Sequence, residues 1–323
     1  MCSKEQHFTL SDSDRSKFLS LSQRYANSYN FYEDAQRAAE TLIPDVKAIL
    51  PKAILNAIDN LKRGIGPQLI SIHNLPVDSY LPSHDDLQQR IAEKTQVSEF
   101  CLLGINGLLE GKLQKEDSSH QLGFIHQVTP LKQSHDEASG RGAGSIPFHA
   151  ENMFIKRPPS VLSLFCLQGE EGVATEYLYV DDIIHYLDQD SIEQLKKPLY
   201  TIITGDGFTR KELKDSAVLE HLYNGWCACR FYEEDRIYSD NDEAKLAIAC
   251  LHRAIDKAKK QHTHSVELSS GSLLMFSNAI RKNHYGGVLH GRSGEMKVNV
   301  SSGPKTTSPR WLQRVCVELS YQI

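Results

Sequence analysis

The chain has 323 residues, of which 36 are Lys or Arg and 41 are Asp or Glu, so its formal charge is −5, and 40% of the residues are hydrophobic. This balance is typical of soluble globular proteins and excludes a disordered or fibrous chain. No run approaches the ~18–20 apolar residues of a membrane span, the first residues lack the apolar segment of a secretory signal, and a mildly acidic chain is a poor nucleic-acid binder. We therefore expect a cytoplasmic protein without membrane or nucleic-acid partners.

The first third of the chain has the spacing of helices. Residues 11–28 begin with Ser and Asp capping candidates and repeat apolar residues at helical intervals, and residues 45–63 and 85–104 have the same periodicity. Pro51 predicts an interruption or a new helical start inside the second segment. The short apolar run at 66–76 predicts a buried strand.

From about residue 122 the pattern changes to short apolar runs separated by Gly, Ser and Pro. Such runs predict a β sandwich or barrel, and two helical inserts are predicted at 188–197 and 242–261. The sequence has no internal repeat and no linker that requires a domain boundary. We therefore predict one α+β domain over 1–323, with a mainly helical flank at 1–120 and a strand-rich core at 121–323.

The seven cysteines are scattered and never spaced as CxxC. An odd and irregular set is typical of reduced thiols rather than of a disulfide framework or a zinc knuckle. Cys227 and Cys229 are two positions apart, which on a strand places both on one face, so we expect them to pack in the core.

His149 and Glu151 are two positions apart in the segment FHAENMF. Alternate residues of a strand point to the same face, so the imidazole and the carboxylate can converge on one ion. A further candidate, His290 in VLHGR, lies far downstream in another strand-like run. Two histidines and one carboxylate are the ligands of non-haem Fe(II) oxygenases, which keep the opposite positions open for a cosubstrate and O₂. The alternative is that His149 is a structural residue bonded to a backbone carbonyl.

The order of the motifs around these residues resembles a known family. The pieces GSIPFHAENMF, PPSVLSLFCLQGEEGVAT, GGVLHGR and RWLQRV follow one another along the chain. This order resembles the clavaminate synthase-like Fe(II)/2-oxoglutarate oxygenases, and more narrowly their arginine, asparagine and lysine hydroxylases. The resemblance implies a double-stranded β-helix (jelly roll) core flanked by helices. It also implies iron ligands at His149, Glu151 and His290, with His284 as a competing candidate for the last position.

The resemblance also implies a site for 2-oxoglutarate. Fe(II) with two neutral histidines and one carboxylate keeps one positive charge, and an arginine adds the second charge that balances this dianion. Arginine suits the role because its planar fork binds a carboxylate through two hydrogen bonds. By their positions in the motifs, Arg310 holds the cosubstrate with Thr175 beside it, and Arg314 binds the substrate carboxylate. The insertion SGEMKVNVSSGPKTTSP before Arg310 leaves Arg292 or Arg314 as alternatives for the cosubstrate.

Acidic residues suggest the kind of substrate. Glu233 and Asp235 match the acidic pair that relatives place in a lid against a basic or amide side chain, and Asp240 and Asp242 form a second such pair. The alternative is that these carboxylates belong to a solvated loop. A basic substrate, lysine or arginine, is therefore favoured.

Polar residues further along the resemblance correspond to contacts with the amino-acid head group. His126 and Ser139 fall at these positions, and Gln127 is the alternative to His126 because relatives more often have an amide residue there. The resulting hypothesis is hydroxylation of an unactivated C–H bond in a free L-amino acid, with release of succinate and CO₂. In the mechanism that the family implies, the protein positions the reactants and excludes water.

Several alternatives stay open at this stage. Halogenases of the superfamily lack the iron-binding carboxylate, so Glu151 favours hydroxylation or a desaturation over halogenation. The same chemistry could act on a carrier-bound or peptide amino acid. Outside this chemistry, the same three ligands could hold Zn(II) in a metallohydrolase, or the chain could be a non-catalytic jelly-roll binding module whose histidines are structural.

Overall fold

The computed structural model describes residues 3–26, 28–84, 86–118, 121–131, 139–204, 211–222, 225–233, 236–280, 286–296 and 309–320. The helices are α1 (Asp12–Tyr25), α2 (Ala35–Ile49), α3 (Lys52–Arg63), α4 (Leu87–Glu93), α5 (Val97–Gly107), α6 (Val180–Ile184), α7 (Gln189–Leu195) and α8 (Asp242–His262). The strands are β1 (Glu5–Thr9), β2 (Leu69–His73), β3 (Lys112–Leu113), β4 (Glu116–Ser118), β5 (Gln121–Gly123), β6 (His126–Val128), β7 (Ile146–His149), β8 (Val161–Gln168), β9 (Ala174–Tyr179), β10 (Tyr200–Ile203), β11 (Glu212–Ser216), β12 (Leu219–His221), β13 (Cys227–Cys229), β14 (Ile237–Tyr238), β15 (His264–Val266), β16 (Leu273–Ser277), β17 (Ala279–Ile280), β18 (Val288–Ser293) and β19 (Trp311–Glu318).

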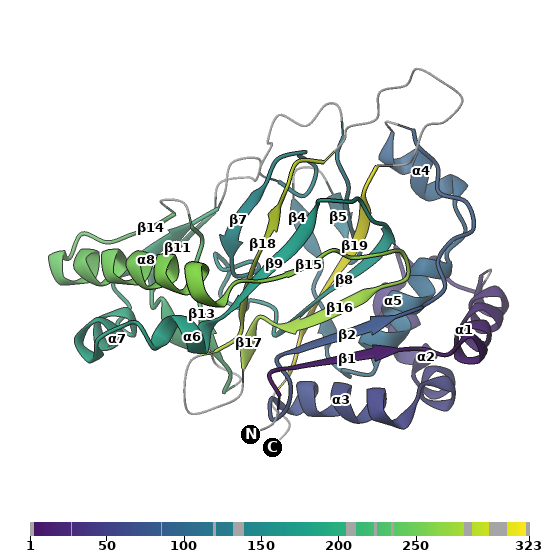
Figure 1. Ribbon diagram of the computed structural model, residues 1–323, viewed down its shortest axis with the longest axis horizontal. Coiled ribbons are helices and arrows are strands. Elements are labelled where there is room, and N and C mark those ends of the chain that lie inside the picture. Colours follow the sequence, from purple (N-terminus) through teal and green to yellow (C-terminus); the bar gives the residue numbers. More distant parts are fainter. Residues whose placement is uncertain are drawn as a thin grey trace.

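Two sheets form the centre of the molecule (Figure 1). The larger has the order β1-β2-β16-β8-β19-β3, with β6 also paired to β19, and the smaller has the order β15-β9-β18-β7. Their facing sides pack together, since Leu164, Phe276 and Leu312 of the larger sheet share one buried cluster with Tyr179 and Val288 of the smaller. The two sheets are thus held face to face by apolar burial, which is the main stabilising term in such a sandwich.

The other face of the larger sheet is covered by helices. Strands β8 and β19 alternate, so that Phe165 and Val315 point into a cluster with α1, α2, α3 and α5 while their neighbours point to the smaller sheet. Figure 1 shows these helices gathered beside β1 and β2. A second group, α6, α7 and α8, packs around Phe231 and the thiols of Cys227 and Cys229 at the opposite end.

The predicted elements are found in outline. The break at Pro51 is confirmed, because α2 ends at Ile49 and α3 begins at Lys52. The helix predicted over 85–104 is two helices, since the chain is extended at Lys94, between α4 and α5. The apolar run that forms β9 ends at Tyr179, and the chain enters α6 at Val180. The mixed α and β character with several sheets is therefore confirmed.

The thiols behave as predicted. All six cysteines that the structure describes are free, and Cys227 and Cys229 are buried in the core. In the described ranges, no helix combines the length and the apolar character needed to cross a membrane.

Candidate metal centre

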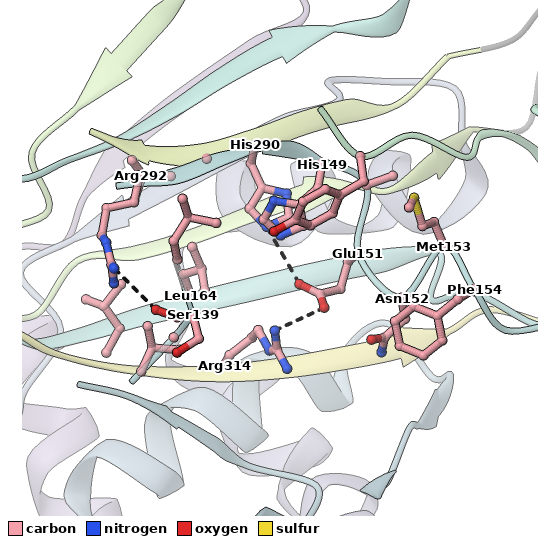
Figure 2. Close-up of a pocket in the computed structure, with 18 of the residues that line it drawn as sticks. Ser139, His149, Glu151, Asn152, Met153, Phe154, Leu164, His290, Arg292 and Arg314 are labelled. Atoms are coloured by element: carbon pink, nitrogen blue, oxygen red, sulfur yellow. Dashed lines mark hydrogen bonds and ion pairs between the residues drawn. The ribbon is translucent and has the colours of Figure 1, made fainter. Parts of the chain in front are cut away.

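Two side chains of the smaller sheet and one from the turn after β7 converge on one point; β7 ends at His149, so Glu151 reaches the site from the turn rather than from the strand. His149 is the last residue of β7 and is paired in register with His290 on the neighbouring strand β18. Their ring centroids lie 4.2 Å apart, and Glu151 Oε2 lies 3.6 Å from His290 Nε2. One ligand atom of each residue lies within 4.8 Å of the other two. Figure 2 shows the three side chains pointing toward one another inside a cavity.

The ring of His149 is oriented by its own strand. Its Nδ1 is 2.9 Å from the carbonyl oxygen of Pro147, which fixes that nitrogen as the donor and leaves Nε2 with its lone pair. Burial, and then the neighbouring His290, lower the pKa of His149 to about 3. The imidazole is therefore neutral at pH 7. A ligating histidine characteristically donates its second N–H to such an acceptor, so the backbone bond of the structural alternative is also the arrangement of a metal ligand.

Glu151 is buried and ionised. Burial alone would raise its pKa, but the Arg314 guanidinium and the His290 imidazole outweigh burial and hold the pKa of Glu151 well below its usual range. Glu151 Oε1 accepts a hydrogen bond of 3.0 Å from Arg314 Nη1. The other oxygen, Oε2, faces the two histidines.

Asn278, between β16 and β17, holds the backbone of Glu151. Its Oδ1 accepts from the Glu151 N–H at 2.7 Å, and its Nδ2 donates to the carbonyl oxygens of Glu151 and Pro159, both at 3.0 Å. Only 3% of Asn278 is exposed. A buried amide whose donors and acceptor are bonded has one orientation. Asn278 therefore fixes the backbone position from which the Glu151 side chain extends. Sequence reasoning missed Asn278, which is 127 positions away from Glu151.

The donor set fits a divalent transition metal. Glu151 Oε2 and His290 Nδ1 are buried and have no hydrogen-bond partner among the described residues. Leaving a carboxylate oxygen unpaired in the interior is costly, so such groups usually have a partner that is a metal, a water or a ligand. Two imidazoles and one carboxylate suit Fe(II) or Zn(II) and leave coordination positions open.

Arg310 and Thr175 meet in the same cavity. Arg310 lies just before β19 in the larger sheet, Thr175 lies on β9 in the smaller, and Arg310 Nη2 is 3.4 Å from Thr175 Oγ1. Only 2% of Arg310 is exposed, and its Nε has no hydrogen-bond partner among the described residues. A buried guanidinium with a donor to spare is suited to bind an anion.

Arg292, one alternative for the cosubstrate, is engaged elsewhere. Its Nε donates to the carbonyl oxygen of Gly144 at 2.8 Å, and its Nη2 donates to those of Ser139 at 3.2 Å and Gly142 at 2.9 Å. The guanidinium therefore organises the loop 139–144 along the cavity wall, and Arg310 is the better placed of the two.

Arg314 lies between the carboxylate ligand and His126. Its Nη1 donates to Glu151, and its Nη2 is 3.2 Å from His126 Nδ1. Burial, and then Arg314, lower the pKa of His126 to about 3, so this histidine is neutral. His126 is thus at the site, while Gln127 points to the other face of the sheet, where its amide bonds Trp311 Nε1 at 2.7 Å and Tyr32 at 3.1 Å.

Ser139 lines the cavity, and its hydroxyl caps its own loop. Ser139 Oγ accepts from the N–H groups of Arg141 at 3.2 Å and Gly142 at 3.0 Å. Ser139 therefore shapes the cavity wall, and its predicted contact with the substrate head group stays a prediction.

The acidic residues that were predicted to lie in a lid have different surroundings in the structure. Glu233 bonds the N–H of Phe148 at 3.1 Å and forms an ion pair with Lys259 of α8, so its carboxylate braces β7. Asp242 is exposed at the start of α8 and pairs with Lys245 at 2.9 Å. Asp240 is exposed as well, in the turn before α8. Asp235 and His284 lie outside the described residues.

The cavity between the sheets has a volume of about 220 Å³. Its described lining includes four arginines but a single carboxylate, that of Glu151. They are Arg236, Arg292, Arg310 and Arg314. The site is therefore electropositive around one carboxylate ligand, which favours anionic ligands.

No family model matches the chain. Among curated proteins, the chain is similar to an L-lysine 3-hydroxylase of Catenulispora acidiphila, with 24% identity over 183 residues. This similarity covers 56% of the chain and 49% of the relative, so the chain matches about half the length of that protein.

Two solved structures share the fold over nearly their whole length. An asparagine oxygenase in complex with Fe(II), 2S,3S-3-hydroxyasparagine and succinate has a TM-score of 0.76 at 19% identity, covering 97% of this chain and 94% of that one. The non-haem iron oxygenase OrfP with Fe, succinate and (3S)-hydroxy-L-Arg has a TM-score of 0.77 at 18% identity, covering 98% and 95%. The chain therefore has the fold of these iron oxygenases, and the predicted resemblance is confirmed at that level.

Proposed function

We propose that the chain is an Fe(II)/2-oxoglutarate-dependent dioxygenase that hydroxylates an unactivated C–H bond of a free L-amino acid and releases succinate and CO₂. One observation carries the proposal: the cluster of His149, Glu151 and His290 faces the buried Arg310–Thr175 pair across a single cavity. Structures of the same fold contain iron with succinate and hydroxylated amino acids, which supports this reading.

The residues divide the chemistry between them. His149, Glu151 and His290 would hold Fe(II), which when bound supplies the activation of O₂ that a hydroxylation requires. Arg310 and Thr175 bind the distal carboxylate of 2-oxoglutarate through charge-assisted hydrogen bonds. The cavity walls from both sheets position the substrate and exclude water.

Arg314 has a role on the substrate side. It lies beside Glu151 and His126 at 3.0 Å and 3.2 Å, so it can orient the carboxylate ligand and bind a substrate carboxylate with its remaining surface. The described lining contains one carboxylate, that of Glu151, so a cationic substrate side chain would need a further carboxylate as its partner. The similarity to an L-lysine 3-hydroxylase and to a structure that contains (3S)-hydroxy-L-Arg supports a preference for lysine or arginine.

The facing sheets and the surrounding helices also suggest the fold type and the domain organisation. We infer that the two facing sheets form a double-stranded β-helix and that the helices and sheets together make one domain over 1–323. The packing of the two sheets around the site supports this inference.

Two other functions use parts of the same geometry. A Zn(II) hydrolase would use the same three ligands, but it has no need of the buried Arg310–Thr175 pair. A binding module would leave the buried Glu151 Oε2 without a hydrogen-bond partner among the described residues, 3.6 Å from His290 Nε2. Desaturation, or action on a carrier-bound or peptide amino acid, would use the same centre on another substrate.

The test is anaerobic reconstitution with Fe(II) and 2-oxoglutarate, followed by O₂ and a panel of free amino acids. We expect amino-acid-dependent succinate and a product heavier by one oxygen atom. His149→Ala should abolish both, whereas His84→Ala, at an exposed histidine, should leave both unchanged. Equal succinate from His149→Ala would contradict the iron site. Coupling only with carrier-bound or peptide substrates would contradict the assignment of a free amino acid.

A further inference from the structure

A second cavity, of about 540 Å³, adjoins the metal-centre cavity. The two cavities share Asn152 and Phe154 as a common wall. In Figure 2 both residues lie at the end of the metal-centre cavity away from Arg292 and Ser139. A ligand that passed this wall would enter the space in front of the three metal ligands.

The described lining of the second cavity is strongly basic. It contains five cations and one carboxylate, Glu318, so its formal charge is 5 − 1 = +4 in a chain whose net charge is −5. The cations are Lys112, Lys115, Lys156, Arg157 and Lys211. We call this set the basic groove. Positive charge is thus concentrated beside the site on a molecule that is acidic as a whole.

The backbone of the basic groove is fixed while its lysines stay in solvent. Gln114 Nε2 donates to the carbonyl oxygen of Arg157 at 2.7 Å, and Thr204 and Lys211 exchange two hydrogen bonds of 3.1 Å. The four lysines are exposed and form no ion pair with the residues that the structure describes. Their charges are therefore available to ligands rather than used in the fold.

The positive charge of the basic groove affects how a dianion approaches the protein. A dianion is repelled by a chain of net charge −5, but at physiological salt charges are screened over about 8 Å, so the nearest charges dominate its final approach. A patch of one sign beside a cavity raises the local concentration and the association rate of the opposite ion by about 10-fold or more. The lysines make no contact with the bound position beside Arg310, so they affect arrival more than residence.

We propose that the basic groove is the port through which 2-oxoglutarate reaches the metal centre, passing Asn152 and Phe154. The inference rests on the proposed function, because it names the route of that reaction's anionic cosubstrate. Lys156 and Lys211 attract the dianion, and Arg310 with Thr175 holds it after it has entered.

The test compares two double charge reversals. Lys156→Glu/Lys211→Glu changes the groove, and Lys52→Glu/Lys197→Glu makes the same change in net charge at exposed lysines outside both cavities. Anaerobic Fe(II)-loaded protein is mixed with 2-oxoglutarate in a stopped-flow instrument, and the charge-transfer absorbance of the complex gives the association and dissociation rates.

We expect the groove variant to associate about 10-fold more slowly at low salt, with an unchanged dissociation rate, and the difference to shrink as salt rises. The control variant should change association less than 2-fold, as an order-of-magnitude bound. Equal slowing in both variants, or none in the groove variant, would overturn the port. A parent protein that forms no complex with 2-oxoglutarate would overturn the proposed function and the port together.

Discussion

At the residue scale, the side chains of the metal centre are held by partners that fix their direction. Pro147 orients His149, Arg314 holds one oxygen of Glu151, and Thr175 bonds Arg310. Such supporting contacts matter because a metal ligand that is misplaced by a fraction of an ångström binds less well. Each of the following variants changes one residue of the site while leaving the three ligands in place.

Replacing Asn278 with alanine should weaken iron binding. The substitution removes the two hydrogen bonds that hold the Glu151 backbone and the third to the carbonyl oxygen of Pro159, so the backbone that carries the carboxylate is no longer fixed. We expect Fe(II) affinity to fall about 10- to 100-fold, measured by titration of the anaerobic apoprotein. Asn106→Ala is the control, since it deletes another buried asparagine, in α5, away from the cavity. Equal loss of affinity in both variants would mean that Asn278 acts only through general stability.

Replacing Arg310 with lysine should weaken the binding of 2-oxoglutarate. Lysine keeps the charge but loses the planar fork, so part of the charge-assisted bonding disappears. We expect the dissociation constant of 2-oxoglutarate to rise about 10- to 100-fold, while Fe(II) affinity stays the same. Arg292→Lys should affect cosubstrate affinity much less, because Arg292 bonds the 139–144 loop. The reverse ranking of the two variants would move the cosubstrate site to Arg292.

His126 should make the metal-free protein sensitive to acid. Burial and Arg314 lower the pKa of His126 from 6.5 to about 3. As the pH falls below ~6.5, the unfolded chain binds a proton that the folded protein does not, so the free energy of unfolding decreases.

His126→Gln should remove this contribution. Between pH 6.5 and 4.5 the variant should lose about 1–2 kcal/mol less stability than the parent, as measured by urea unfolding at a series of pH values. His84→Gln, at an exposed histidine, should follow the parent. If His126→Gln also follows the parent, the histidine is protonated in the folded protein.

At the element scale, β7 depends on the segment that follows β13. The N–H of Ala150 donates to Phe231 at 2.8 Å, the N–H of Glu233 donates to Phe148 at 3.0 Å, and the Glu233 carboxylate ties the pair to Lys259 of α8. This segment therefore braces the strand that carries His149. The sequence predicted Glu233 as a substrate contact, and the brace is a second role that a variant can separate from the first.

Glu233→Gln and Lys259→Met distinguish these two roles. If Glu233 acts only as a brace, both variants break the same ion pair and should lower the midpoint of thermal unfolding by a similar amount, with matching changes in KM for a basic amino acid. A substrate role for Glu233 instead predicts that KM rises in Glu233→Gln alone, because Lys259→Met leaves the carboxylate in place.

How far the sequence predicted the elements depends on local signals. The break at Pro51 and the long helix α8 were predicted because both follow from local chemistry, and the structure adds an Asn241 cap at the start of α8. The chain is extended at Lys94 because that residue is buried between Asp78 and Glu99, at 3.2 Å and 2.5 Å, a tertiary contact without a local signal. Such tertiary contacts override the helix propensity of the local sequence.

At the scale of the whole molecule, the site is formed between two sheets. The two histidines belong to the smaller sheet and Glu151 to the turn after its strand β7, while Arg314 lies on β19 of the larger sheet and Arg310 just before it, so the whole site forms only when the two sheets pack together. The order of motifs predicted which residues meet, because each stands in a recognisable segment. It did not predict Asn278, whose contacts depend on the packing of distant segments, or that Gln127 faces the helices.

The positions of the charges, like the contacts of Asn278, could not be predicted from the sequence. A net charge of −5 led us to expect no nucleic-acid partner but carried no information about where the charges lie. In the folded chain four arginines line the metal-centre cavity and five more cations line the groove beside it. The distribution that bears on function therefore arises from folding, which brings Lys112, Lys156 and Lys211 together from separate parts of the chain.

The central claim is that the chain inserts oxygen from O₂ into an amino acid at the His149–Glu151–His290 centre. The most direct measurement is turnover under heavy-isotope O₂, with mass analysis of both products. A dioxygenase should place one labelled oxygen atom in the amino acid and one in succinate, in equal amounts. The His149→Ala variant should form neither labelled product. A product whose added oxygen comes from water, formed without any dependence on 2-oxoglutarate, would contradict the proposed dioxygenase reaction and favour a hydrolytic one.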